Sequence, residues 1–184
     1  MDAAQRLLSD QLDDATQRLL STARVLAEPD LRAPSLLPGW TRAHVLAHLA
    51  RNADAMRNLL IGARSRTDRP AYASAAARAA DIEAGAVRNP ADLMADLADS
   101  AMALRTVARK LPDATWRAEV QMLDPPRFPA AQLLTRRLVE VELHHADLGA
   151  GYSPADWPPA FTALELGEPM QSQRRDRLAR PPAD

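Results

Sequence analysis

The sequence contains no cysteine among its 184 residues. This absence excludes disulfide bonds, thiolate metal ligands and a nucleophilic thiol of the protein itself. Any thiol chemistry must therefore take its sulfur from another molecule. Aromatic residues are also scarce, at 4%, whereas hydrophobic residues reach 47% and are mostly alanine and leucine. This composition favours packed helices over sheets, so we expect an all-α protein.

Long apolar runs and charge of one sign are missing as well. No stretch approaches the roughly 20 apolar residues of a membrane span, and the opening segment MDAAQRLLSDQLDD lacks the basic and apolar regions of a signal peptide. The formal net charge is −1, and the basic residues, almost all arginine, are scattered among acids. A nucleic-acid-binding surface would need them clustered. We expect a cytoplasmic protein that binds neither membrane nor nucleic acid.

Apolar residues recur at steps of three and four in four long segments, which is the pattern of one helix face. The predicted helices cover residues 2–27, 41–64, 90–110 and 130–148, with a shorter helical piece at 74–84. Thr41 stands at the N-cap position of the second long helix, and Pro90 suits the first turn of the third. Gly149 and Gly151 can end the fourth. Residues 111–129 are rich in proline and predict a loop, with a brief extended piece at TWRAEVQM.

The long connection between the second and third long helices predicts a four-helix bundle with a crossover. Such bundles often carry metal ligands on facing helices. We assign residues 1–150 to a metal-binding bundle of this kind. Residues 151–184 are Pro-rich, and we expect them to form a partly disordered C-terminal tail.

The four histidines occur as two pairs, in the second and fourth long helices. Residues four apart lie about 40° apart around a helix, so His44 with His48, and Glu140 with His144, can each address one point. The apolar arc of the second helix is centred much nearer His48 than His44. On the fourth helix His144 lies inside the buried arc, whereas His145 has a valine instead of a carboxylate one turn earlier.

The favoured ligand set is therefore His48, Glu140 and His144. Two imidazoles and one carboxylate leave a coordination position open, as in catalytic zinc sites with three protein ligands. Asp147 could orient an imidazole from outside that set. Taken singly, His48 is more often a satisfied core histidine, and Glu140 is more often a solvated charge or the partner of a neighbouring arginine.

Three ordered blocks carry a family resemblance: LLPGWTRAHVLAHLARNADAMRNLL (36–60), YASAAARAADIEAG (72–85) and EVELHHADLGAGYSPADWP (140–158). Over about residues 1–160 the chain resembles the N-terminal domain of the mycothiol-dependent maleylpyruvate isomerase family, a branch of the DinB-like metal-binding bundles. The resemblance implies that His48, Glu140 and His144 bind zinc or another divalent metal. It also implies mycothiol as a cofactor.

The family's reference reaction is the cis–trans isomerisation of maleylpyruvate to fumarylpyruvate. Zinc can lower the pKa of a bound thiol, and the thiolate can add to the activated double bond, which rotates as a single bond before the thiolate leaves. Related members are thought to catalyse other thiol transfers. The implied partners are a small-molecule thiol and a small electrophilic or dicarboxylate substrate, and the oligomeric state stays open.

Further candidates lie near the predicted ligands. Arg51, Asn52 and Arg137 would suit the carboxylates of a substrate, and Tyr72 and Asp81 match the crossover block and are candidates for cofactor binding. Each residue also has a purely structural alternative to a role in binding. The arginines and the acid can be solvated, an asparagine or arginine can hydrogen-bond to a neighbouring element, and the tyrosine ring can simply be packed.

The chain also departs from the family pattern. From about Phe161 the resemblance ends, and we expect no room for the second domain that helps to close the active site in full-length isomerases. Val139 stands where we expect an arginine. Two hypotheses follow: a zinc-dependent, mycothiol-using isomerase or thiol transferase, and a non-catalytic metal-binding or partner-binding bundle that lacks the family's C-terminal domain.

Overall fold

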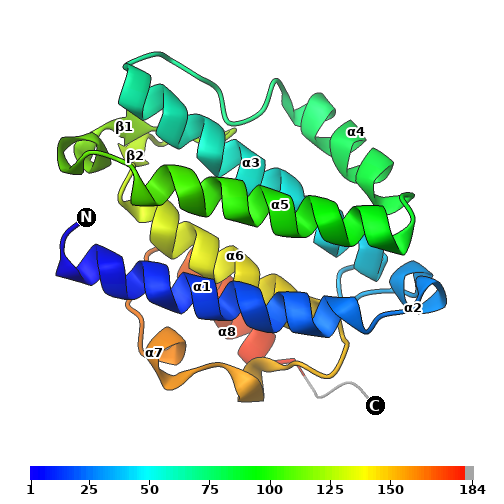
Figure 1. Ribbon diagram of the computed structural model, residues 1–184. Coiled ribbons are helices and arrows are strands. Elements are labelled where there is room, and N and C mark those ends of the chain that lie inside the picture. Colours follow the sequence, from blue (N-terminus) through cyan, green and yellow to red (C-terminus); the bar gives the residue numbers. More distant parts are fainter. Residues whose placement is uncertain (181–184) are drawn as a thin grey trace.

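Four long helices form the body of the computed structural model, which describes residues 1–180 (Figure 1). α3 packs against α5 and α6, and α1 packs mainly against α6 and more loosely against α5. The predicted four-helix bundle, with its long crossover between the second and third long helices, is therefore confirmed. The four helices are α1 (Ala3–Arg24), α3 (Arg42–Ser65), α5 (Pro90–Arg109) and α6 (Gln132–Asp147).

Local sequence sets the ends of these helices close to their predicted positions. The Thr41 side chain accepts a hydrogen bond from the His44 backbone N–H, so Thr41 is the N-cap of α3 as predicted. Asn89 caps α5, and Pro90 occupies its first turn. After α6, Gly149 adopts a φ of +60°, a left-handed conformation that costs glycine little.

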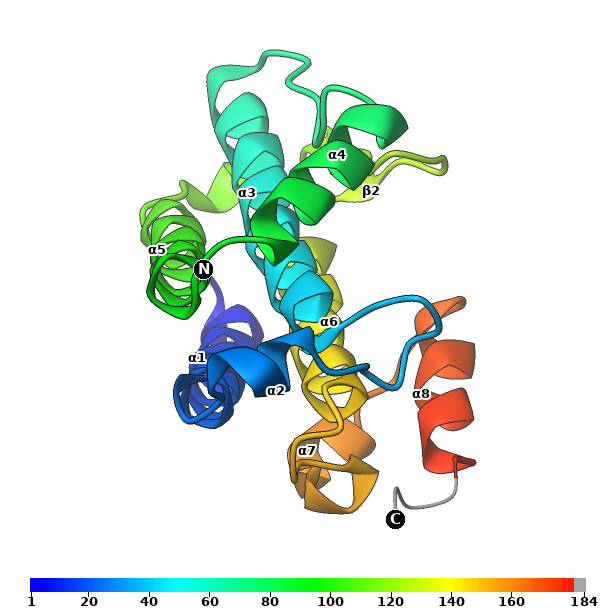
Figure 2. The same cartoon turned by 90° about the vertical axis from the view of Figure 1, so that its right-hand side faces the viewer.

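The crossover helix α4 (Ala75–Ala86) lies along the outer side of α3 (Figure 2). It carries the chain back, so that α3 and α5 run in the same direction (Figure 1). Gly85 permits the close approach, because a Cβ atom there would lie 2.8 Å from the Cβ of Ala47. The crossover helix is thus held against the part of α3 that contains His48.

Short elements close the bundle. α2 (Glu28–Arg32) precedes α3, and η1 (Asp113–Arg117) leads into a two-stranded antiparallel sheet of β1 (Glu119–Val120) and β2 (Phe128–Pro129), in which Val120 faces Phe128. The extended piece predicted at TWRAEVQM is confirmed only at β1, because its first residues form η1. α2 and β2 were not predicted.

The segment after residue 150 contains helices that the sequence pattern did not predict. They are η2 (Pro154–Asp156), α7 (Pro159–Thr162) and α8 (Met170–Leu178). α8 packs against α6 (Figure 2), and Arg177 near its end pairs with the buried Asp147. Residues 181–184 of the expected disordered end lie outside the described residues.

Within residues 1–180, none of the helices combines the length and the apolar character needed to cross a membrane.

Candidate metal centre

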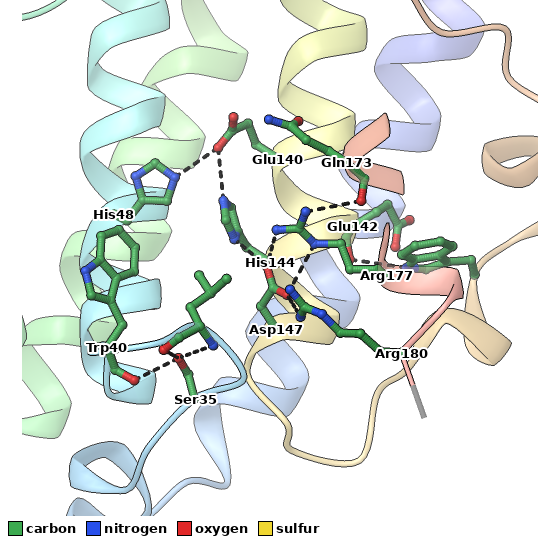
Figure 3. A network of polar contacts seen from close by, with 12 residues as sticks. Ser35, Trp40, His48, Glu140, Glu142, His144, Asp147, Gln173, Arg177 and Arg180 are labelled. Carbon is green, nitrogen blue, oxygen red and sulfur yellow. Dashed lines mark hydrogen bonds and ion pairs between the residues drawn. The ribbon is translucent and has the colours of Figure 1, made fainter. Parts of the chain in front are cut away.

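Two imidazoles converge on one carboxylate where α3 faces α6 (Figure 3). His48 Nε2 lies 2.9 Å from Glu140 Oε2, and His144 Nε2 lies 3.4 Å from the same oxygen. One potential ligand atom from each residue lies within 4.8 Å of the other two. The structure therefore brings together the three residues predicted as ligands, and metal binding by them stays a prediction.

The start of α3 is tied to the end of α6, which sets the distance between these side chains. Arg42 donates from Nε to the Leu148 carbonyl and from Nη2 to the Gly149 carbonyl, both at 2.8 Å. A cation at this position also suits the negative end of the α6 dipole. In addition, the Leu36 N–H donates to the Asp147 carbonyl at 2.8 Å. These contacts anchor both ligand-bearing helices at one end of the bundle.

His48 takes the inward orientation that its helical wheel predicts, whereas on α6 the wheel placed His144 inside the buried arc and the structure buries His145 more deeply than His144. His48 is 5% exposed and turned into the bundle. His44 instead lies 3.2 Å from Glu83 on the crossover helix. His145 faces α1, with its Nε2 atom 2.7 Å from Thr22 Oγ1. Only one histidine of each pair therefore points toward Glu140.

Burial and hydrogen bonding set the charges of the cluster. Burial lowers the pKa of His48 below its usual value. Burial alone would raise the pKa of Glu140, but its contacts with His144 and His48 hold it well below the usual range. Burial alone would lower the pKa of His144, yet its hydrogen bonds to Asp147 and Glu140 raise it to about 9. Near neutral pH, Glu140 is therefore an anion and His144 a cation.

The donor set and its spacing fit a zinc-like cation. With bonds of about 2.0–2.1 Å, the ligand atoms of a tetrahedral zinc site lie roughly 3.3 Å apart. The distances of 2.9 and 3.4 Å from Glu140 Oε2 to the two imidazole nitrogens are close to that spacing. A metal ion would take the place of the protons between these groups, as metal binding to histidine generally requires.

Asp147 contacts the ring nitrogen of His144 that faces away from Glu140, and it connects this histidine to the C-terminal segment (Figure 3). Its side chain is fully buried, and Oδ2 lies 2.9 Å from His144 Nδ1. Arg177 and Arg180 each donate to it at 2.7 Å. Burial alone would raise the pKa of Asp147, but the hydrogen bonds to His144 and Arg177 lower it to about 2. The predicted contact between Asp147 and His144 is confirmed; the two arginines were missed.

Arg78 and Trp40 also adjoin the cluster and were not among the predicted site residues. Arg78 donates from Nη2 to Nδ1 of His48 at 3.0 Å, and its guanidinium carbon lies 5.7 Å from the centre of the Tyr72 ring. The Trp40 ring lies 5.5 Å from that of His48. Arg78 is the only cationic residue in the block YASAAARAADIEAG, a signal in the sequence that could have identified it.

Three of the other candidates share one surface cavity. Arg51, Tyr72 and Asp81 line a cavity of about 330 Å³ between α3 and the crossover segment. Arg51 is paired with Asp54 at 3.1 Å and with Asp96 on α5. Tyr72 is connected to the ligand cluster through Arg78. The roles predicted for these residues in substrate or cofactor binding stay predictions.

The remaining two candidates are buried together in the bundle. Arg137 is 2% exposed and donates from Nη1 to Asn52 Oδ1 at 2.8 Å and to the Leu49 carbonyl at 2.9 Å. Asn52 is 3% exposed. These contacts support the alternative in which Asn52 satisfies a neighbouring helix. Val139, where the resemblance led us to expect an arginine, is also buried, at 2% exposure.

Comparisons with a family model and with solved structures point to the same family. A family model for the mycothiol maleylpyruvate isomerase N-terminal domain matches residues 12–149. Two crystal structures, of the mycothiol-dependent maleylpyruvate isomerase and of a histidine-to-alanine mutant of it, align with TM-scores of 0.82 at 30% and 29% sequence identity. Each alignment covers 85% of this chain and 65% of the solved chain. Among curated proteins, none matches.

Proposed function

Because the chain belongs to the family of mycothiol maleylpyruvate isomerase N-terminal domains, we propose that it is a zinc-dependent enzyme that uses mycothiol. Its reaction is the cis–trans isomerisation of maleylpyruvate or a related thiol transfer. The observation that carries this proposal is the convergence of His48 and His144 on one oxygen of Glu140. These three residues hold the metal and leave a coordination position open for the thiol.

The residues around the ligand set have separate tasks in this proposal. Bound zinc supplies a Lewis acid that lowers the pKa of a thiol ligand. Asp147 keeps a proton on His144 Nδ1, so that Nε2 presents its lone pair to the metal. Trp40 and the neighbouring core shield His48 from water. This enclosure strengthens the electrostatic interactions at the site.

Arg78 is the group best placed to recognise a carboxylate. In the metal-bound form Nε2 of His48 is a ligand, so Nδ1 carries the ring proton and can no longer accept a hydrogen bond from Arg78. The guanidinium must then find another acceptor. A carboxylate of the substrate or of the thiol cofactor offers a charge-assisted, bidentate one beside the metal.

The first experiment measures metal content. We expect close to one equivalent of zinc in protein purified without a nickel column, determined by elemental analysis, and loss of that metal in the His48→Ala variant. The matched control is His44→Ala, because His44 lies on the same helix and contacts Glu83 instead of Glu140. Less than about a tenth of an equivalent in the wild-type protein, or the same content in both variants, would reject the metal centre.

The second experiment tests the thiol. The metal-loaded protein should bind mycothiol in calorimetry, and the zinc-free protein should not. Turnover of maleylpyruvate, followed by absorbance, should require both zinc and mycothiol. If the metallated protein neither binds mycothiol nor converts maleylpyruvate or another electrophilic thiol acceptor, the enzyme proposal is wrong.

A second candidate function is a non-catalytic metal-binding or partner-binding bundle. It is favoured by one observation: Arg137 and Asn52, which were predicted to bind substrate carboxylates, are buried and hydrogen-bond to each other instead. A protein that retains zinc but has no affinity for mycothiol would support this candidate. The two experiments therefore separate loss of the metal centre from loss of catalysis.

A further inference from the structure

A second cavity opens on the other side of the bundle, between α1 and α5. These two helices pack together more loosely than either packs with its other neighbour. The cavity has a volume of about 150 Å³, and its walls come from all four long helices. They are largely apolar; the leucines that line it are Leu12, Leu20, Leu60, Leu104, Leu133 and Leu134.

Arg137 lies in the wall of this cavity and carries an incompletely satisfied guanidinium. It is 2% exposed, and its Nη1 donates only to uncharged acceptors, the Leu49 carbonyl and Asn52 Oδ1. Among residues 1–180, its buried Nη2 nitrogen has no hydrogen-bond partner. A buried donor left unsatisfied costs about 1–3 kcal/mol, and more when it is charged. Such a group needs an acceptor that the described protein does not supply.

The guanidinium remains charged at neutral pH. Burial lowers the pKa of Arg137 to about 10, and the negative charges of Glu140 and Asp54 oppose that shift. Arg105 also lines the cavity and is paired with Asp13 at 3.0 Å. Arg24 lines the cavity as well. The lining therefore carries three arginines, Arg24, Arg105 and Arg137, against one carboxylate, Asp13, and favours an anion.

We infer that this cavity binds a small monocarboxylate with a compact apolar body. The carboxylate would give Arg137 Nη2 a charge-assisted hydrogen bond, and the leucine walls would cover the body. A cavity of about 150 Å³ accommodates a molecule the size of benzene. Inorganic phosphate fits poorly, because it would lose its hydration without gaining apolar contacts. The site is independent of the proposed zinc chemistry.

Calorimetric titration of the full chain with benzoate tests the inference, with benzyl alcohol as the uncharged probe of the same size. We expect saturable one-to-one binding of benzoate, and binding of benzyl alcohol at least about tenfold weaker, because the alcohol leaves the arginine without an anionic acceptor. Arg137→Met should remove this preference. Inorganic phosphate should not compete with benzoate.

A second variant covers the case in which Arg137→Met fails to fold. Ala101→Phe fills the cavity from α5 and leaves Arg137 in place, so it should abolish benzoate binding without changing the circular dichroism spectrum. His48→Ala should leave benzoate binding unchanged, which separates this site from the metal centre. Benzoate binding that survives Ala101→Phe, equal affinity for benzyl alcohol, or no saturation below about 10 mM benzoate would overturn the inference.

Discussion

α6 carries a histidine and a glutamate on the side that faces α3 and another histidine and glutamate on the side that faces α1. The contacts of these residues differ between the two sides. Toward α3, Glu140 and Asp147 flank the His144 ring, and the pKa of this histidine is raised to about 9. Toward α1, His145 stacks on Tyr152 with 3.7 Å between ring centres, and burial and then the positive charge of Arg18 lower its pKa to about 4. The pKa values of the adjacent histidines thus differ because His144 contacts carboxylates and His145 does not.

The carboxylates of Glu140 and Glu142 also differ in their exposure and in their hydrogen-bond partners. Glu142, on the α1 side, is 1% exposed, and both its oxygens are occupied: Oε1 accepts from Arg18 and Oε2 from the Tyr152 hydroxyl, each at 2.6 Å. The Glu140 side chain is 30% exposed and faces two imidazoles. Complete pairing leaves Glu142 a structural group. Glu140 keeps the capacity to bind a cation.

The largest expected effect comes from exchanging one carboxylate on each face. Glu140→Gln should weaken zinc binding more than about 100-fold, because removing a ligand costs more than removing its supporting partner. Glu142→Gln should change zinc affinity less than about threefold, since Glu142 contacts Arg18 and Tyr152 instead. Competition with a chromogenic chelator measures both affinities. Equal losses in the two variants would contradict the division between the faces.

A smaller effect is expected from Asp147→Asn. The amide oxygen can still accept a hydrogen bond from His144, but the negative charge that strengthens this ligand is lost, so zinc affinity should fall about 10-fold to 100-fold. The comparison variant is Asp156→Asn, which alters a carboxylate of η2 that contacts Ser153, the N-cap of that helix. The same chelator competition applies, with circular dichroism to check folding. Unchanged zinc affinity would show that Asp147 serves only to hold α8.

His145 should make the metal-free protein less stable in acid. Its pKa is about 4 in the folded protein and 6.5 in the unfolded chain, so the unfolded state binds the extra proton between these values. Stability is therefore complete above pH 6.5, falls as the pH drops, and falls no further from this group below about pH 4. The loss between pH 7 and 4.5 should be about 2 kcal/mol.

Urea unfolding at the two pH values measures this loss. The glutamine side chain in the His145→Gln variant cannot be protonated. The difference in the free energy of unfolding between pH 7 and pH 4.5 should therefore be smaller by about 2 kcal/mol in this variant than in the wild-type protein. A variant with the same pH dependence as the wild-type protein would show that His145 is not the titrating group.

The smallest effect should follow from Arg180→Met. It removes one of the two arginines that pair with Asp147 and leaves both Arg177 and the contact with His144. The free energy of unfolding should drop by about 1 kcal/mol, because the remaining partner keeps the buried carboxylate paired. Zinc affinity should change less than about threefold. A loss of zinc as large as that of Asp147→Asn would mean that α8 itself positions His144.

Much of the fold and of the candidate centre could be predicted from local sequence. The steps of three and four between apolar residues locate the long helices and turn His48 inward, because an amphipathic helix can bury only one face. Burial does not separate His144 from His145, which is the more deeply buried of the two. The residue one turn earlier does, because it is Glu140 for His144 and Val141 for His145. Caps at Thr41 and Asn89 are likewise local, because each satisfies backbone groups a few residues away.

Other features had no local signal. Within the described chain α8 has no buried residue, so its sequence has no apolar face from which a helix could be predicted. Arg177 near its end and Arg180 just beyond it reach Asp147 across 30 and 33 residues. Arg78 reaches His48 only because Gly85 lets α4 pack closely against α3. The unsatisfied nitrogen of Arg137 depends on neighbours from three other helices.

The sequence by itself determined the four long helices and the three residues that converge between α3 and α6, because helical periodicity fixes side-chain direction one turn at a time. Only the tertiary structure decided which charged groups are paired. Ion pairing depends on distances between elements remote in the chain, and in a water-poor interior those distances control which groups are charged. Glu140 and Glu142, two residues apart, have different partners for that reason.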